Sequence, residues 1–142
     1  MDVDATLVAP CSPAELFAWV DDLERYPQWL EIVTKVAPLD GDAWAVDLRG
    51  RLGPLARSKR LRMVRGAAAG PTSVRFERAE LDGRTHSPWV LAADVTPHAD
   101  GSELHMGLHY GGGLFGPVLE RVLRDEIERS RLRLLALVSD AP

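Results

Sequence analysis

The spacing of hydrophobic residues changes twice along this chain, and each change marks a change of secondary structure. Residues 2–9 read as a first strand. From residue 12 onward the apolar positions follow a helical period, and from residue 34 to residue 110 they alternate with polar ones. After residue 115 the helical period returns. A helix brings every third or fourth side chain to one face, whereas a strand brings every second one there. The pattern therefore predicts a strand, two helices, a run of strands and a last helix.

The first helical segment carries recognisable start and stop signals. Residues 12–15 (Ser-Pro-Ala-Glu) form a capping box, in which serine is the N-cap and proline takes the first helical position. We predict a helix from there to about Leu23. Pro27 interrupts any continuation, because proline lacks the backbone N–H that a helix interior needs. Arg25–Val33 is therefore predicted to form a second, short helix.

The alternating region predicts an antiparallel sheet with one apolar face and one hydrated face. Asp-Gly or Gly-Pro pairs at 40–41, 53–54, 70–71, 82–83 and 100–101 separate the strands. Together with residues 2–9 these runs predict about six or seven strands. The apolar positions expected on the inner face are Trp44, Val46, Leu48, Leu61, Met63, Val74, Phe76, Trp89, Leu91, Ala93, Val95, Leu104, Met106, Leu108 and Tyr110.

The last segment predicts one long amphipathic helix of about 22 residues. It follows Gly116 and Pro117, and its apolar stripe includes Phe115, Leu119 and Leu123. We expect this helix to cover most of the apolar face of the sheet. Strands flanked by helices indicate an α+β fold class rather than a βαβ wind. With 142 residues and no linker or repeat, residues 1–142 are predicted to form a single domain.

Composition places the chain among ordinary globular proteins, with 46% hydrophobic and 27% charged residues and a net charge of −4. The single cysteine, Cys11, cannot form an internal disulfide. The first residues lack the basic and apolar regions of a signal peptide. Apolar runs fall far short of the roughly 18 residues of a membrane span. We therefore expect a cytoplasmic protein without integral membrane association.

Positive charge gathers in one segment. Residues 48–65 contain seven basic residues and no acidic one, between more acidic flanks. This predicts a basic hairpin, Arg49–Arg65, which is either a solvated outer face or a docking patch for an acidic protein partner or a lipid headgroup. Leu61 and Met63 interleave with the basic residues, but no aromatic residue is present there for base stacking. We therefore expect no nucleic-acid binding.

No pattern of metal ligands or of a cofactor loop is visible. His105 and His109 would lie about 13 Å apart on one strand, too far to share a metal ion. No HExxH motif or Cys/His cluster is present. The run Gly111–Gly113 lacks the Lys-Ser/Thr of a phosphate loop and reads as a turn onto the last helix. We predict neither a metal site nor a cofactor.

The element order, the stretch Tyr26-Pro27-x-Trp29-Leu30 after Asp22 and the long closing helix resemble the START-related, polyketide cyclase/dehydrase-like superfamily. Residues 108–117 are similar to a small actinobacterial branch of it. The resemblance implies a helix-grip fold, in which a curved antiparallel sheet wraps around the C-terminal helix. It also implies a cavity between them for a sterol, lipid, polyketide or isoprenoid. A seven-stranded sheet around one helix also leaves more interior than one helix face fills.

The expected function is reversible binding of a hydrophobic small molecule. Arg78 continues the inner face of its strand, so it either reaches an acceptor on the protein or ligand, or turns into water at the strand end. The predicted ligand-binding residues are Trp29, Trp44, Leu61, Met63, Phe76, Arg78, Trp89, Leu91, Leu108, Tyr110, Phe115, Leu119 and Leu123.

Two alternatives remain open at this point. Family cyclases use an arginine and a tyrosine to polarise polyketide carbonyls, so the resemblance implies Arg78 and Tyr110 as catalytic candidates for an aromatase/cyclase or dehydratase. The second alternative is a toxin-like interaction module of a toxin–antitoxin pair, which would dock an acidic partner through the basic hairpin.

Overall fold

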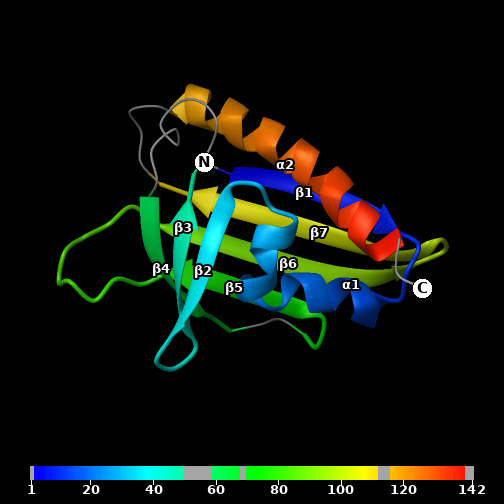
Figure 1. Ribbon diagram of the computed structural model, residues 1–142, viewed down its shortest axis with the longest axis horizontal. Helices are drawn as coiled ribbons and strands as arrows, with labels where there is room; N and C mark the ends of the chain where they lie inside the picture. The colour runs from blue at the N-terminus through cyan, green and yellow to red at the C-terminus, as the bar shows by residue number, and fades with distance from the viewer. Residues whose placement is uncertain (1, 50–58, 68–69, 112–115, 140–142) are drawn as a thin grey trace.

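The computed structural model describes residues 2–49, 59–67, 70–111 and 116–139, with the backbone alone described for residues 116–119. Within these ranges the elements follow the predicted order (Figure 1). The helical elements are α1 (Pro13–Val20), the 3-10 helix η1 (Leu23–Gln28) and α2 (Gly116–Ser139). The strands are β1 (Asp2–Ala9), β2 (Val33–Leu39), β3 (Ala43–Leu48), β4 (Lys59–Arg65), β5 (Ser73–Arg78), β6 (Trp89–His98) and β7 (Gly101–Tyr110).

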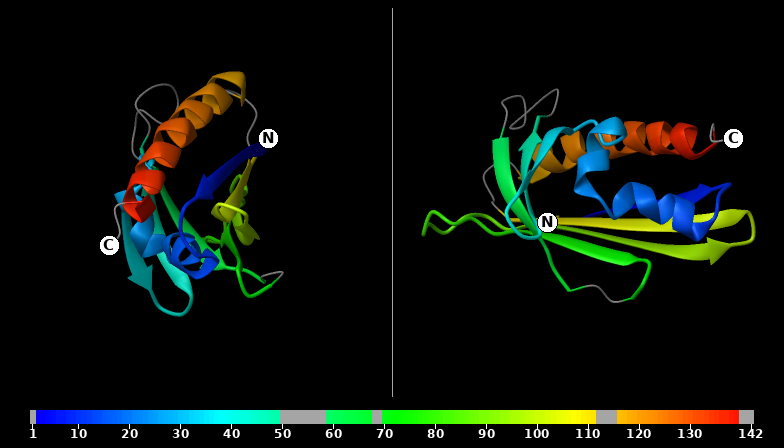
Figure 2. Two further views of the ribbon diagram at one scale, coloured as in Figure 1. Left: turned by 90° about the vertical axis from the view of Figure 1, so that its right-hand side faces the viewer. Right: turned by 60° about the horizontal axis from the view of Figure 1, so that its bottom comes forward.

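All seven strands join one antiparallel sheet in the order β1-β7-β6-β5-β4-β3-β2. The two edge strands, β1 and β2, are consecutive in the sequence, so α1 and η1 must carry the chain from one edge of the sheet to the other. The sheet curves, and β2, β3 and β4 rise at one end toward the start of α2 (Figure 2). The predicted α+β fold class and the curved antiparallel sheet are confirmed.

Strand register explains why the alternating residues share a face. β6 and β7 pair along their whole length, with Trp89 opposite Tyr110 and Val95 opposite Leu104. Partners in an antiparallel pair point to the same side of the sheet. The inner face thus gathers the apolar residues of every strand into one core.

The segment between β1 and β2 differs from the prediction. The first helix ends at Val20 rather than near Leu23, and the second element is a 3-10 helix that stops at Gln28. Val33, expected to end a helix, instead pairs with Leu48 as the first residue of β2. A second short helix is therefore present, but its predicted range, Arg25–Val33, was wrong.

Local chemistry explains this difference. The side chain of Asp22 accepts a 2.9 Å hydrogen bond from the backbone N–H of Glu24, which starts a new helical turn. Pro27 lies inside that turn and cannot continue an α-helical ladder. The β-branched pair Ile32 and Val33 favours extended backbone. The prediction from sequence gave too little weight to this β-branched pair.

The last helix covers less of the sheet than expected. α2 lies along β1, while α1 lies over β6 and β7 and η1 lies beside β2 (Figures 1 and 2). Seven strands span about 29 Å, whereas one helix with its side chains is about 10–12 Å wide. Three helical elements therefore share the inner face, and the space between them becomes the site described next.

Candidate ligand-binding cavity

An apolar cavity of about 100 Å³ lies between the inner face of the sheet, η1 and α2. Its walls combine β1 residues such as Val3 and Leu7 with Val46 and Leu48 of β3 and with Leu134 of α2. Nearly all of the lining surface belongs to carbon atoms. Such a chamber is suited to a hydrophobic guest, because burying apolar surface is the main contribution it can make to binding.

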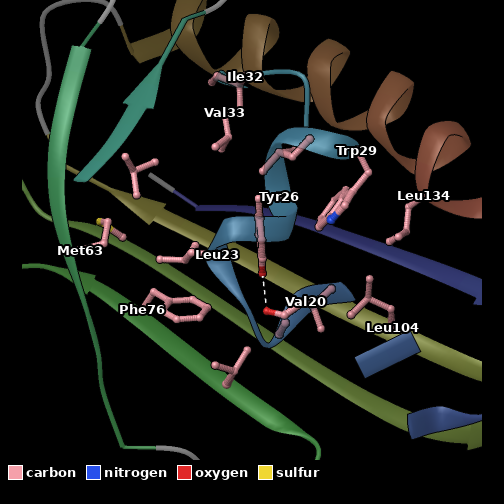
Figure 3. Close-up of a cluster of buried hydrophobic side chains, with 14 of the residues drawn as sticks. Val20, Leu23, Tyr26, Trp29, Ile32, Val33, Met63, Phe76, Leu104 and Leu134 are labelled. Carbon is pink, nitrogen blue, oxygen red and sulfur yellow. Dashed lines mark hydrogen bonds between the residues drawn. The ribbon is translucent and has the colours of Figure 1, made fainter. Parts of the chain in front are cut away.

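η1 provides the aromatic wall of this cavity. Tyr26 and Trp29 pack together with ring centroids 4.9 Å apart (Figure 3). The Tyr26 hydroxyl donates to the carbonyl of Val20 at 2.8 Å, and the indole N–H of Trp29 donates to the carbonyl of Trp19 at 3.1 Å. Burial raises the pKa of the Tyr26 hydroxyl, which therefore stays neutral. Both polar atoms are satisfied within the protein, so this wall presents apolar ring surface to the cavity.

One side of α2 is fastened to β1. Arg131 lines the cavity, and its Nε donates to the backbone carbonyl of Thr6 at 2.8 Å. Its Nη1 also donates to Glu128 at 2.9 Å. Arg131 therefore bridges α2 and β1 along their line of contact, which is the first of two seams of α2. The carboxylate of Glu128 balances its charge.

The opposite side of α2 is fastened to the segment that follows η1. The hydroxyl of Ser130 accepts from the backbone N–H of Glu31 at 3.1 Å, and the Glu31 carboxylate accepts from Arg129 at 3.0 Å. Arg133 donates to the carbonyl of Gln28 at 3.0 Å. Polar bonds thus flank the cavity along both sides of α2, while its walls are apolar.

Glu126 is an acidic residue among the cavity-lining residues, and only 2% of it is exposed. Its Oε1 lies 2.6 Å from Nη2 of Arg129, which also bonds Glu31. The hydrogen bond to Glu31, reinforced by Glu126, raises the pKa of the Arg129 guanidinium. A buried carboxylate requires such a partner. The pair places a carboxylate at the cavity wall with its charge compensated.

Seven of the predicted ligand-binding residues lie in the cavity wall. Five come from the inner face of the sheet, one is the C-cap of η1 and one comes from α2. They are Trp29, Leu61, Met63, Trp89, Leu91, Leu108 and Leu123.

Trp44 and Phe76 lie elsewhere on the same face of the sheet. Their rings meet edge to face with centroids 5.6 Å apart. The guanidinium of Arg65 lies over both rings and donates to the Asp21 carboxylate at 2.9 Å. These side chains therefore fill the core beneath the end of α1, outside the cavity wall.

The side chain of Arg78 is only 8% exposed, but its acceptors belong to the protein. Its Nε donates to Glu80 at 2.7 Å, and its Nη1 donates to the carbonyl of Ser87 at 3.3 Å. Its Nη2 lies 3.3 Å from Nδ1 of His86. Of the environments left open by the sequence, the structure places Arg78 beside a protein carboxylate, outside the cavity wall.

Tyr110 is almost fully buried and lies behind the wall rather than in it. Its ring stacks on Trp89 with centroids 5.3 Å apart. Burial, together with nearby Glu120, raises the pKa of its hydroxyl. Arg78 and Tyr110, the catalytic candidates, therefore both flank the cavity without lining it.

Two predicted residues cannot be placed, because Phe115 and the side chain of Leu119 lie outside the described residues. Sequence reasoning also missed several wall residues. The ones in α2 were detectable from helical spacing, since they follow Leu123 at intervals of three and four. Those near η1 were hidden by the wrong helix prediction. The missed residues include Tyr26, Leu30 and Ile32 in and after η1, Glu126, Ser130, Arg131 and Leu134 in α2, and Val3, Leu7, Val46 and Leu48 in the sheet.

The basic hairpin is described only in part, because residues 50–58 lie outside the described ranges. Arg60 bonds Asp47, with Nε 2.7 Å from Oδ1. Arg62 donates to the carbonyl of Ala79 at 2.8 Å. These two arginines already have partners on the protein, so docking of an acidic partner here stays a prediction.

The described part of the chain contains no cluster of three or more histidine, cysteine, aspartate or glutamate side chains placed to hold a metal ion. None of its helices combines the length and the apolar character that crossing a membrane requires.

Comparison with solved structures shows the same fold in distant relatives. A START superfamily protein from Mycobacterium smegmatis has a TM-score of 0.74 at 16% identity over 97% of both chains. A protein from Chromobacterium violaceum has a TM-score of 0.73 at 14% identity over 99% of both chains. A Thermus thermophilus protein has a TM-score of 0.65 at 17% identity over 96% of this chain and 99% of its own.

The sequence itself matches a family model as well. No curated protein matches it significantly. Residues 1–139, however, match the model described as polyketide cyclase / dehydrase and lipid transport. This match spans nearly the whole chain, and the helix-grip architecture agrees with it. The protein belongs to the polyketide cyclase/dehydrase and lipid-transport family.

Proposed function

We propose that the protein binds an apolar small molecule, such as a lipid, a polyketide or an isoprenoid, in the cavity between the sheet and α2. The observation that carries this proposal is an almost entirely apolar chamber bounded by the sheet, η1 and α2. Burial of ligand surface there contributes about 25 cal/mol for each Å² removed from water. The family description, which includes lipid transport, supports the same function.

The size of the cavity limits how such a molecule can fit. Its volume is about 100 Å³, whereas a cavity that takes up benzene measures roughly 150 Å³. Even a ligand with a single aromatic ring therefore requires the walls to move apart. The sheet strands are joined by continuous backbone ladders, so α2 is the wall that can move at least cost.

The contacts that hold α2 against its neighbours are weak enough to allow this movement of the helix. Arg131 and Arg133 bridge from α2 to β1 and η1, and their side chains are 38% and 42% exposed. Exposed polar bridges of this kind contribute only about 0–1 kcal/mol each. A modest gain from ligand burial offsets their loss. We infer that the ligand enters and leaves as α2 lifts from β1, because the contact with the segment after η1 also includes the buried Ser130.

The test is to block the cavity from within α2. Leu123, which is 1% exposed, lines the cavity, whereas Leu132 lies on the outer face of the same helix and is 69% exposed. Leu123→Trp should abolish uptake of ethylbenzene measured by calorimetry, because the indole fills the chamber. Leu132→Trp is the matched control and should bind as the unmodified protein does. Native mass spectrometry of the purified protein should also show a co-purified apolar molecule that is lost in Leu123→Trp.

Urea unfolding verifies that each variant is folded, since overpacking a core commonly costs about 1–3 kcal/mol. If Leu123→Trp does not fold, Met106→Phe narrows the cavity from β7 instead. A folded cavity-filled variant that still takes up ethylbenzene like the control would refute the proposal.

A further inference from the structure

Within the described part of the chain, one buried polar atom of a cavity-lining residue has no hydrogen-bond partner. The indole nitrogen of Trp89 is a hydrogen-bond donor, and it is buried without an acceptor among the described residues. Trp89 is 5% exposed and is part of the cavity wall. Buried donors are nearly always paired, because an unpaired one forfeits the hydrogen bonds that it makes with water in the unfolded chain.

The other polar side chains of the aromatic wall are paired. Trp29 carries the same indole donor, and it bonds the carbonyl of Trp19 at 3.1 Å. Tyr26 bonds the carbonyl of Val20 at 2.8 Å. Comparable donors in the same cavity wall are thus satisfied, whereas the described residues provide no acceptor for Trp89.

The ring of Trp89 is held in place by its neighbours. Tyr110 lies opposite it in the β6–β7 pair, and the two rings stack with 25° between their planes. The ammonium of Lys59 lies 5.7 Å from the ring centroid. A cation over an indole draws electron density toward itself, which leaves the N–H more positive and a stronger donor. Trp89 is thus a fixed, polarised donor at an otherwise apolar wall.

We propose that Trp89 donates a hydrogen bond from Nε1 to an oxygen of the bound molecule, and so selects apolar ligands that carry an uncharged acceptor such as a carbonyl. The inference rests on the proposed function, since it assigns the polar contact of that same cavity. This hydrogen bond would orient the ligand, because the apolar contacts of the cavity do not favour one direction.

The charges around the cavity favour an uncharged acceptor over a carboxylate. Arg129 already compensates the carboxylate of Glu126, so this pair offers no free positive charge to an anion. Arg131 is the basic residue of the described wall, and its guanidinium is engaged by Thr6 and Glu128. Lys59 lies near the Trp89 ring, outside the cavity-lining residues. A ketone, ester or ether oxygen needs one donor and no counter-charge, and this wall offers that donor.

The experiment compares two probes that differ at one group. Acetophenone and ethylbenzene have nearly the same shape, but acetophenone has a carbonyl where ethylbenzene has a methylene. Both are titrated by calorimetry into the unmodified protein and into Trp89→Phe. Loss of the donor should weaken acetophenone binding about 5- to 100-fold, because the buried carbonyl is left unpaired. Ethylbenzene binding should change less than that, since it makes no such bond.

Trp29→Phe is the matched control, because it removes an indole donor that the protein itself already satisfies. Any change it causes should be shared by the two probes, so the ratio of their dissociation constants stays as in the unmodified protein. An equal effect of Trp89→Phe on both probes would overturn the inference and leave the binding function standing. Failure of ethylbenzene itself to bind the unmodified protein would instead count against the proposed function.

A second measurement follows ligand binding in the unmodified protein and does not require any variant to bind ligand. In a ¹H–¹⁵N spectrum the indole signal of Trp89 is assigned by its absence from Trp89→Phe. Acetophenone should move the Trp89 indole proton downfield in the unmodified protein. The Trp29 indole proton should show no comparable shift with acetophenone, and the Trp89 indole proton should show none with ethylbenzene. An unshifted Trp89 signal at saturating acetophenone would overturn the inference.

Discussion

The hydroxyl of Tyr26 donates a 2.8 Å hydrogen bond to the backbone carbonyl of Val20, the last residue of α1 (Figure 3). Carbonyls in the last turn of a helix have no partner within the helix. Tyr26 is fully buried and thus satisfies one such carbonyl from η1. This bond joins the two helical elements that support the aromatic wall of the cavity.

Removal of this hydroxyl should destabilise the fold without changing its architecture. Tyr26→Phe is expected to lower the free energy of unfolding by about 1–2 kcal/mol in urea, because the buried carbonyl of Val20 is left unpaired. Thr34→Val is the control, because the Thr34 hydroxyl donates to the backbone carbonyl of Asp47 at an exposed position. Loss of that hydroxyl should lower the free energy of unfolding by less than about 0.5 kcal/mol. Equal unfolding free energies for the two variants would contradict this interpretation.

Gly101, at the turn between β6 and β7, has a backbone conformation that other residues avoid. Its φ angle is +137°, and a Cβ atom built there would lie 2.3 Å from the carbonyl oxygen of Ala9. Gly101→Ala should cost about 1–3 kcal/mol from backbone strain, with the clash added to it. The expected readout is a lower urea midpoint.

Gly70 offers a control for that substitution. A Cβ atom at Gly70 meets nothing within 4 Å, and its φ lies outside the strained region. Gly70→Ala should therefore be neutral or should stabilise by about 0.4–1 kcal/mol through the unfolded chain. A Gly101→Ala protein as stable as Gly70→Ala would show that the β6–β7 turn tolerates a side chain.

Burial of Cys11 gives a prediction for pH. The Sγ atom lies 3.8 Å from the hydroxyl of Ser102, and burial raises the pKa of the thiol above its ordinary value of 9.0. Below about pH 9 both folded and unfolded thiols keep the proton, so this contribution to stability is complete. Above about pH 9 the thiol of the unfolded chain ionises first. The free energy of unfolding then falls with rising pH until the thiol of the folded protein ionises as well.

The measurement compares urea midpoints at pH 8 and pH 10. The unmodified protein should lose more stability over this interval than Cys11→Ala, in which the thiol is absent. Ionisation of the buried tyrosines is common to both proteins and cancels in the comparison. An identical loss in both proteins would show that the thiol has the same pKa in the folded and unfolded states.

The sequence predicted the sheet well because its signal is local and strict. Alternation places Leu91 and Leu108 on one face whatever the rest of the chain does, and the two residues are paired partners in β6 and β7. The range of the second helix was mispredicted because Pro27 marks a break in the first helix but does not show where the next element ends. Ile32 and Val33 favour extended backbone, and the pairing of Val33 with Leu48, which is not a local contact, completes the strand.

The site was predicted in part for a related reason. Alternation tells which face of the sheet a residue occupies, but sheet curvature and helix placement decide which part of that face borders the cavity. Trp44 and Phe76 lie on the expected face, yet the Arg65 guanidinium and the end of α1 fill the space beside them. Trp89 lies farther along the face and borders the cavity. Catalysis through Arg78 and Tyr110, the toxin-like role and the actinobacterial branch stay predictions.

The two seams of α2 share a property with a consequence for sequence divergence. Arg131 and Arg133 bond the main-chain carbonyls of Thr6 and Gln28, and Ser130 bonds a main-chain N–H. Every residue has a main-chain carbonyl, so replacement at positions 6 and 28 leaves these anchor atoms in place. At these positions the bonds to α2 tolerate a change of side chain opposite the helix, whereas the bond from Arg129 depends on the carboxylate of Glu31.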